Sequence, residues 1–269
     1  MCLALLVISC GGPVGDNSTH RDTYAQPTIL NEAVIMQERN DAPHAMASSS
    51  QLYQKGVLVS AKHITDREDD NTFKVFFNGR AYRGTFMKTP PLSDLVLVQI
   101  EGLDPATTPE PYTLGPAAQV GDRVFVRGIH PHPPNLQKER TIVPIFSGYY
   151  GLKGRKDEFV FDNLPARVVN TNVVVDMGNI KGAERWLEGT QNVYTELRTD
   201  DDHLFSFAGL SGGPILNERG QIVGVVATEQ PDFRLESPNS PFLKQEFHKI
   251  NIVPVSELRA LLATLPPSR

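Results

Sequence analysis

Short runs rich in β-branched and aromatic residues, each bounded by turn residues, recur along most of this 269-residue chain. The runs expected to form strands are 32–36, 57–60, 73–77, 81–87, 95–100, 123–128, 141–146, 158–161, 167–176, 214–216 and 222–227. Parallel βαβ units would need helices between these strands, and the pattern has none. The one amphipathic helix is expected near the C-terminus, where Leu258, Leu261, Leu262 and Leu265 recur at helical spacing and Ser256 can cap the first turn. The pattern therefore predicts an all-β barrel or sandwich with a single late helix.

Two turns and the composition support this expectation. The Asn78-Gly79 pair between two strand-like runs is a strong hairpin signal, and residues 217–220 (NERG) mark a second one. Apolar residues make up 40% and charged residues 21% of the chain, as is usual for a globular domain. The net charge of −5 argues against general nucleic-acid binding, which needs a basic surface. No apolar run approaches the length of a transmembrane helix.

Both cysteines, Cys2 and Cys10, lie at the N-terminus, so the rest of the chain is expected to have no disulfide and no cysteine-based metal site. Residues 7–10 (VISC) follow an apolar stretch and resemble a bacterial lipobox, in which Cys10 would carry a lipid. This interpretation predicts an exported, membrane-anchored bacterial lipoprotein, in the periplasm or at the cell surface. No Lys or Arg precedes the short apolar run, which a misplaced start codon would explain. The alternative is a frayed apolar terminus on a cytoplasmic protein.

Three segments carry residues suited to nucleophilic catalysis. The strand-like run of residues 56–64 delivers His63, residues 93–100 present Asp94 before an apolar strand, and the glycine-rich run of residues 207–216 contains Ser211. A serine needs a base to take its proton, and neutral imidazole does this near pH 7. A carboxylate can fix the imidazole tautomer, and glycines let backbone N–H groups turn toward a developing oxyanion. The order His, Asp, Ser is the order of a catalytic triad on a double β-barrel.

Together, these segments resemble the chymotrypsin/trypsin-like serine proteases, in the bacterial branch similar to the HtrA/Deg protease domain. The matching runs are 59–64 (VSAKHI), 94–100 (DLVLVQI), 121–128 (GDRVFVRG), 209–214 (GLSGGP) and 220–225 (GQIVGV). The resemblance implies two antiparallel six-stranded β-barrels with a short C-terminal helix. With the lipobox-like signal and a polar tether at 1–26, it places one barrel at 27–118 and the second barrel with the helix at 119–269. It also implies a serine endopeptidase that needs no cofactor and no metal and acts on polypeptides through an acyl-enzyme on Ser211; the oligomeric state stays open.

The chain also departs from the animal enzymes of this family. No cysteine stands beside His63, and Leu210 replaces the acidic residue that pairs with a freshly cut N-terminus there, so activation by that route is not expected. No PDZ domain is expected after the helix. The distance from Asp94 to Ser211 is long for a compact bacterial enzyme, and the extra residues are expected in loops at 149–204.

The resemblance also assigns substrate-binding positions. The backbone N–H groups of Gly209 and Ser211 would form the oxyanion hole, and Phe205 would lie at the base of the primary specificity pocket. The segment of Ala227, Thr228 and Glu229 would pair with an extended substrate by strand addition. Without an aspartate at the pocket base, a small or medium apolar residue is expected before the scissile bond.

Three weaker interpretations remain beside the protease. Residues 209–213 also fit the Gly-x-Ser-x-Gly elbow of α/β-hydrolases, with Asp232 and His248 as nominal partners, but Pro214 opposes the helix which that fold requires. A catalytically silent, protease-like binding module is the non-enzyme alternative, and fluorophosphonate labelling would separate it from an active enzyme. The pair of histidines in residues 130–132 lacks a third metal ligand at suitable spacing, so a solvated proline-rich loop is expected there.

Overall fold

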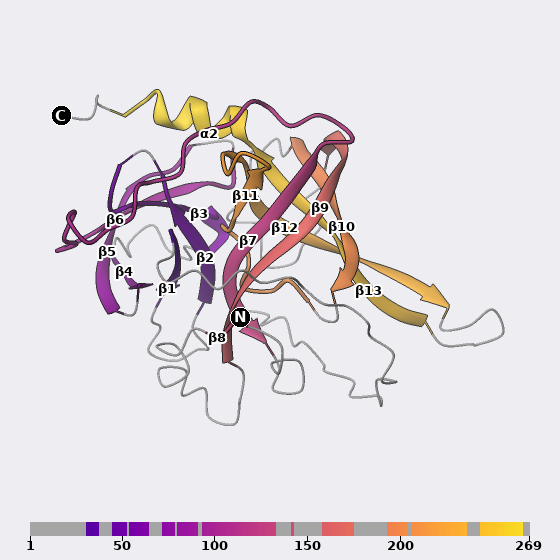
Figure 1. Cartoon of the computed structure of the whole chain (residues 1–269), viewed down its shortest axis with the longest axis horizontal. Helices are drawn as coiled ribbons and strands as arrows, with labels where there is room; N and C mark the ends of the chain where they lie inside the picture. Colours follow the sequence, from indigo (N-terminus) through magenta and orange to yellow (C-terminus); the bar gives the residue numbers. More distant parts are fainter. Residues whose placement is uncertain are drawn as a thin grey trace, which may run out of the picture.

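The strands form two closed antiparallel barrels, followed by one short helix (Figure 1). In the computed structural model, the residues described are 31–37, 45–52, 54–64, 72–78, 80–90, 93–132, 141–142, 158–174, 193–203, 206–235 and 243–265. This architecture is the one implied by the resemblance. Within these residues, no helix is long and apolar enough to cross a membrane.

The first barrel closes in the order β1-β2-β3-β6-β5-β4. Its strands are β1 (Glu32–Gln37), β2 (Ala45–Gln51), β3 (Val57–Ser60), β4 (Thr72–Phe77), β5 (Arg80–Lys88) and β6 (Val96–Ile100). The predicted hairpin joins β4 to β5: Phe77 pairs with Arg80, and Asn78 adopts a φ of 42°. Asparagine tolerates this left-handed conformation better than most residues, which explains why the turn falls there.

The second barrel is a ring of β7, β9, β10, β13, β12 and β11, and β10 closes it by pairing with both β13 and β9. Strand β8 (Thr141–Ile142) adds to β9 outside this ring. The ring strands are β7 (Arg123–His132), β9 (Glu158–Val174), β10 (Val193–His203), β11 (Pro214–Asn217), β12 (Ile222–Leu235) and β13 (Leu243–Pro254). The second predicted turn is present, since Gly220 N–H donates to the carbonyl of Asn217 and Gly220 has a φ of 72°.

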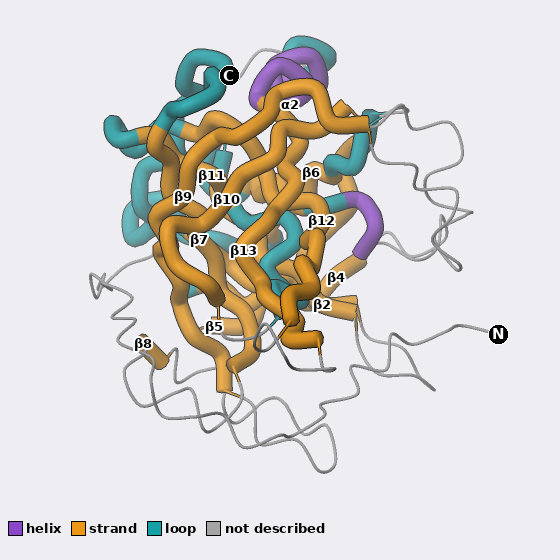
Figure 2. Tube along the Cα trace, turned by 90° about the vertical axis from the view of Figure 1, so that its right-hand side faces the viewer, coloured by secondary structure: helices purple, strands orange, loops and turns teal. Residues whose placement is uncertain are grey.

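A shared apolar cluster fills the space between the barrels and beneath helix α2 (Val255–Leu262). It joins Leu95 and Leu97 of the first barrel to Tyr194 and Val225 of the second, with Leu258 among the helix residues that cover it. Figure 2 shows α2 along the top of the barrels. The helix was predicted, but its cap was wrong: the N-cap is Pro254, with no side-chain cap hydrogen bond, and Ser256 lies inside the helix.

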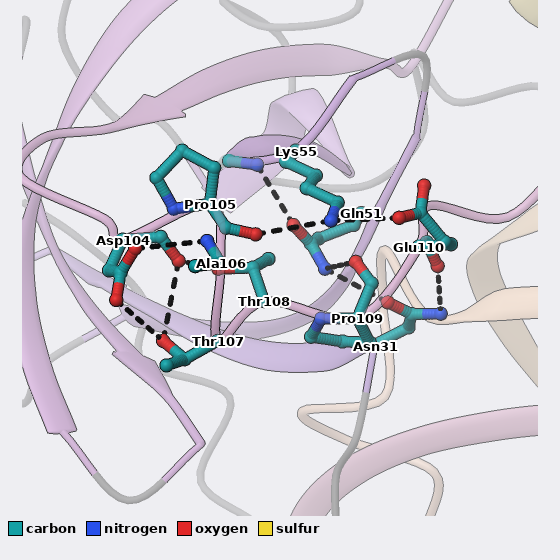
Figure 3. Close-up of polar contacts among 11 residues, drawn as sticks. Asn31, Gln51, Lys55, Asp104, Pro105, Ala106, Thr107, Thr108, Pro109 and Glu110 are labelled. Carbon is teal, nitrogen blue, oxygen red and sulfur yellow. Dashed lines mark hydrogen bonds and ion pairs between the residues drawn. The ribbon is translucent and has the colours of Figure 1, made fainter.

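The segment that leaves β6 is fastened to the first barrel (Figure 3). Lys55 Nζ lies 2.8 Å from Glu110 Oε1 and donates to the carbonyl of Pro105. The buried Gln51 amide donates to Asn31 and to the carbonyl of Pro109. These contacts hold the start of the connection between the barrels against β2 and the turn before β3.

Three strands of the structure were not predicted, namely β2, β10 and β13. Strand β9 also runs unbroken where two shorter strands were expected. Within the expected loops at 149–204, the structure corrects the segments that it describes: β10 and the longer β9 are ring strands of the second barrel. The other residues of that span lie outside the described residues.

Candidate active site

The geometry of β3 and β6 brings His63 and Asp94 together. These strands pair antiparallel, with Ser60 opposite Val96, so the end of β3 lies beside the start of β6. His63 follows β3 in the 3-10 turn Lys62–Ile64, and Asp94 lies just before β6. The His63 Nδ1 atom lies 2.7 Å from Asp94 Oδ2, and the His63 backbone N–H donates to Asp94 Oδ1 at 2.9 Å.

The surroundings of this pair favour a protonatable imidazole. The Asp94 side chain is fully buried, whereas 32% of the His63 side chain is exposed. Desolvation is the largest influence and lowers the pKa of His63, but the charge of Asp94 and its hydrogen bond raise it more, so the net pKa of His63 lies above its usual value. The hydrogen bond at Nδ1 leaves Nε2 as the ring atom that can exchange a proton with a nucleophile.

Ser211 lies in a tight loop that both barrels hold in place. The loop is tied to the first barrel by the Ser48 N–H, which donates to the Gly209 carbonyl at 2.9 Å. It is tied to β12 by the Gly212 N–H, which donates to the Val226 carbonyl at 2.7 Å. Gly212 has a φ of 84°, and a Cβ atom there would overlap Ser60 Oγ and the Ser48 carbonyl oxygen. Gly212, the residue after Ser211, therefore lies against the end of β3, and β3 leads directly to His63.

The Ser211 hydroxyl is hydrogen-bonded, whereas two backbone N–H groups of the same loop are not. Ser211 Oγ donates to the carbonyl of Ala227 at 3.3 Å, and within the described residues it has no hydrogen bond to His63. The N–H groups of Gly209 and Ser211 have no acceptor in that same part of the chain. Gly209 has a φ of 91°. The loop therefore offers two free backbone donors beside the serine, which is the requirement for an oxyanion hole.

Leu210 explains how the loop is supported without an acidic residue. Its side chain is fully buried in the apolar core of the second barrel, together with Val126 and Ile215. A Cβ atom on Gly128 would overlap the Leu210 side chain, so β7 approaches the loop closely. Apolar packing thus takes the place that a buried ion pair has in enzymes with an acid before the serine.

Glu229 has a role that its sequence position did not indicate. Its carboxylate accepts a hydrogen bond from Ser206 Oγ through Oε1 and one from the Phe207 N–H through Oε2, each at 2.6 Å. The Glu229 side chain therefore holds Ser206 and Phe207, which lead into the loop that contains Ser211. One edge of β12 pairs with β13. Its opposite edge pairs with β11 only as far as Val225, so beyond Val225, at Ala227, that edge carries no further strand in the described sheet. Phe205 and Cys10 lie outside the described residues.

Ser48 was missed by sequence reasoning although it joins three parts of the site. Besides its bond to Gly209, its carbonyl accepts the Ser60 hydroxyl at 2.7 Å, and its Oγ accepts the Ile129 N–H at 3.1 Å. The run of three serines in β2 has no apolar alternation, so nothing in the sequence marked it as a strand. These hydrogen bonds join β2 to β3 and to β7, next to the loop that contains Ser211.

The expectation of a solvated loop at residues 130–132 was wrong. His130 belongs to β7 and is fully buried, and its Nε2 atom lies 2.5 Å from Asp162 Oδ2 of β9. No group of three or more potential metal ligands occurs in the residues that the structure describes. The α/β-hydrolase interpretation is also not favoured, because strand β11, not a helix, follows the serine.

Comparison with known families gives a direct match. The family model described as the trypsin-like peptidase domain matches residues 47–225, which include His63, Asp94 and Ser211. A comparison with curated protein sequences finds no significant match.

Solved structures show the same fold at low sequence identity. The active form of the Rv3671c protease from M. tuberculosis has a TM-score of 0.57 at 16% identity, over 90% of this chain and 83% of that one. The MamO protease domain from Magnetospirillum magneticum, in its apo form, gives 0.52 at 14% identity, over 87% and 96%. The HtrA-type protease AlgW, solved with a tripeptide, gives 0.52 at 13% identity, over 88% and 60%.

Proposed function

Because the chain belongs to the trypsin-like peptidase family and is a serine-type endopeptidase, we propose that Ser211 is its nucleophile, His63 its general base and Asp94 the residue that orients His63. The observation that supports this assignment is the 2.7 Å contact between His63 Nδ1 and the fully buried carboxylate of Asp94. A buried carboxylate paired with a half-exposed imidazole is the arrangement that keeps the second ring nitrogen available for proton transfer.

Acylation begins when His63 Nε2 takes the proton of Ser211 as Oγ attacks the carbonyl carbon of the peptide bond. The negative charge that develops on the carbonyl oxygen is stabilised by the N–H groups of Gly209 and Ser211, which have no acceptor of their own within the described residues. The imidazolium then donates its proton to the leaving amine, which departs and leaves an ester on Ser211. Asp94 stabilises the imidazolium through Nδ1–H throughout this step.

Deacylation repeats the sequence with water as the nucleophile. His63 takes a proton from water, the hydroxide attacks the ester carbon, and the same two N–H groups hold the oxyanion. Collapse of the intermediate returns the proton to Ser211 and releases the acid product.

Labelling with a fluorophosphonate tests the assignment, since the probe reacts only with an activated serine. We expect stoichiometric labelling of Ser211, loss of labelling in Ser211→Ala, and a fall of at least about 10³-fold in peptide hydrolysis by that variant. Ser256→Ala is the matched control, because it removes an exposed serine hydroxyl from helix α2, outside the loop that contains Ser211 and outside the proposed triad. Full activity in Ser211→Ala would refute the assignment.

The alternative, a protease-like module without catalytic activity, can be tested through the hydrogen bond from Ser211 Oγ to the Ala227 carbonyl. In the catalytic state the hydroxyl must leave this carbonyl and donate to His63. If no labelling occurs at any pH while the chain is folded, the proposed role of Ser211 as nucleophile is refuted and the silent-module alternative is supported.

We further propose a small or medium apolar residue before the scissile bond, with the substrate pairing along Ala227, Thr228 and Glu229. Support comes from the uncovered edge of β12 and from the two donors that already occupy the Glu229 carboxylate, which leave it less able to bind a substrate cation. A peptide library measures the preference directly. Dominant cleavage after Arg or Lys would overturn this proposal.

Export and lipid attachment at Cys10 are a separate proposal, supported by the lipobox-like residues 7–10. A bacterial origin is part of it. Metabolic labelling with a palmitate analogue would detect the lipid, and Cys10→Ser is expected to abolish both the label and recovery in the membrane fraction. Unlabelled, soluble wild-type protein would refute it.

A further inference from the structure

Strand β12 contains a β-bulge at Ala227, close to the candidate nucleophile. In the pairing of β12 with β13, Val226 lies opposite Ile252 and Thr228 lies opposite Asn251, and the register shifts between these two pairs. Ala227 is therefore the extra residue of β12 and has no partner in β13. Bulges are common next to active sites, where they redirect a group of the strand.

The bulge explains why the Ala227 carbonyl reaches Ser211. The backbone of Val226 already faces the loop that contains Ser211: its N–H donates to the Gly213 carbonyl at 2.9 Å, and its carbonyl accepts the Gly212 N–H at 2.7 Å. In a regular strand, the next carbonyl would point to the opposite edge, toward β13. The Ala227 carbonyl instead accepts the Ser211 hydroxyl at 3.3 Å. Two successive residues of β12 thus face the same loop, which the bulge makes possible.

Asn251 of β13 lies opposite this bulge and is fully buried. Side chains alternate between the two faces of a strand, and the neighbours Ile250 and Ile252 belong to the core of the second barrel. The Asn251 side chain therefore lies on the other face of the sheet, the face of Val253, which belongs to the apolar cluster between the barrels. Ala227 belongs to the same cluster. Asn251 thus places an amide on the side of the sheet where the two barrels meet.

The Asn251 amide is bonded to the residue that follows the bulge. Its Nδ2 atom donates to Thr228 Oγ1 at 3.3 Å. Its Oδ1 atom is buried and has no hydrogen-bond partner within the described residues. A buried amide with an unused acceptor opposes folding, so an apolar side chain would serve the core better at this position. The bond to Thr228 accounts for the amide where packing does not.

We propose that Asn251 is a positioning residue that fixes the bulge of β12 through Thr228 and thereby sets the direction of the Ala227 carbonyl. Without this hydrogen bond, the bulge is free to move along β12, and the Ala227 carbonyl is free to turn toward β13. The Ser211 hydroxyl then loses its acceptor, and the edge proposed to pair with the substrate loses its fixed register. This inference rests on the function proposed above for Ser211 and for that edge.

The test is Asn251→Leu, which keeps the branched shape of the side chain and removes its hydrogen-bonding groups. The Ala227 carbonyl carbon is followed by NMR with and without Ser211→Ala, so no catalysis is needed. We expect Ser211→Ala to shift this resonance in the otherwise wild-type chain, because the carbonyl loses a donor, and to leave it unchanged when Asn251→Leu is also present. Ala106 and Ala263 are followed by threonine, as Ala227 is, so isotope labelling of the Ala–Thr peptides provides them as internal references.

The kinetic consequences of Asn251→Leu have opposite signs. Labelling by a small fluorophosphonate is expected to become about threefold faster, because the Ser211 hydroxyl loses an acceptor that competes with His63. The KM of a peptide long enough to reach Thr228 and Glu229 is expected to rise about fivefold, while its kcat changes less than about twofold. A general loosening of the fold would instead slow both reactions.

Three further variants complete the test. Thr228→Val removes the acceptor and should reproduce the NMR result of Asn251→Leu, including the case in which Asn251→Leu does not fold. Thr228→Ser keeps a hydroxyl there and should retain the wild-type response of the Ala227 resonance to Ser211→Ala. Thr195→Val is the matched control, because it removes a buried hydroxyl from β10, on the other side of β13, and it should also retain this response.

Two results would overturn the inference. In one, the Ala227 resonance responds to Ser211→Ala to the same extent, or not at all, with and without Asn251→Leu. In the other, Asn251→Leu slows labelling and peptide cleavage together. If the NMR response is lost as expected in a chain that neither labels nor cleaves peptides, the inference stands and the proposed function alone is refuted.

Discussion

A buried ion pair joins the two barrels, and we expect its disruption to destabilise the interface that carries the active site. Glu32 at the start of β1 is fully buried, and its Oε1 accepts from Arg127 Nε of β7 at 3.0 Å. The same oxygen accepts from the Tyr112 hydroxyl, in the connection between the barrels, at 2.6 Å. One carboxylate oxygen thus links the first barrel, the second barrel and the segment between them. The perturbation is Arg127→Met, which keeps much of the side-chain volume and removes the charge.

The magnitude follows from what remains around Glu32. Removing one partner of a buried pair typically costs about 3–5 kcal/mol, because the other charge stays buried. Here the Tyr112 hydroxyl continues to donate, and 23% of the Arg127 side chain is exposed. We therefore expect about 3 kcal/mol, the low end of that range. The double variant Glu32→Gln/Arg127→Met leaves no buried charge and should lose less than the sum of its single variants by at least about 1 kcal/mol.

Urea unfolding followed by circular dichroism measures these differences. The control is Glu110→Gln, whose ion pair with Lys55 (Figure 3) has a carboxylate that is 84% exposed and should be worth less than about 1 kcal/mol. If Arg127→Met costs less than about 1 kcal/mol, or if the double variant is additive, the pair does not hold the barrels together.

Three further predictions concern the site itself. In the proposed mechanism catalysis needs neutral His63, and the pKa of His63 is raised, so the acid limb of kcat/KM should have its midpoint above about 6.5. The raised pKa also adds folding stability below that pH, and this stability is lost as the pH rises through the raised pKa. Gly212→Ala should abolish fluorophosphonate labelling through its overlap with Ser60, whereas Gly220→Ala, with open space around its Cβ, should cost only about 1–2 kcal/mol and keep labelling. Glu229→Gln should lower kcat/KM about tenfold with little change in far-UV circular dichroism, because the amide replaces one of the two accepting carboxylate oxygens with an NH2 donor that faces a loop donor.

The contact between His63 and Asp94 was the most predictable part of the candidate site. Each residue flanks a strand whose apolar run is easily recognised, and both strands are buried along almost their whole length. The register of the pair could not be predicted, because a one-residue slip would fit the same apolar pattern. It depends on contacts far apart in the sequence, such as Ser60 opposite Val96.

The three missed strands have a common physical cause. Strand β2 is rich in serine, β10 ends in a run of acidic residues, and β13 carries Lys, Gln and Glu in its first half. Strand pairing partners, not local propensity, hold these segments in the sheet.

Leu210 shows how the absence of a familiar residue can be recognised in the sequence while the contacts of its replacement stay hidden. The sequence indicated that no acid precedes Ser211, which excludes support of the loop by an ion pair with a cut N-terminus. It did not indicate what supports the loop instead, because a leucine in a glycine-rich turn has no periodic partners. In the structure, Leu210 packs into the second barrel's core while Ser48 holds the Gly209 carbonyl from the first barrel. These two contacts hold the loop while the N–H groups of Gly209 and Ser211 have no acceptor among the described residues. In the proposed mechanism, the Ser211 hydroxyl must still move away from the Ala227 carbonyl before it can donate to His63.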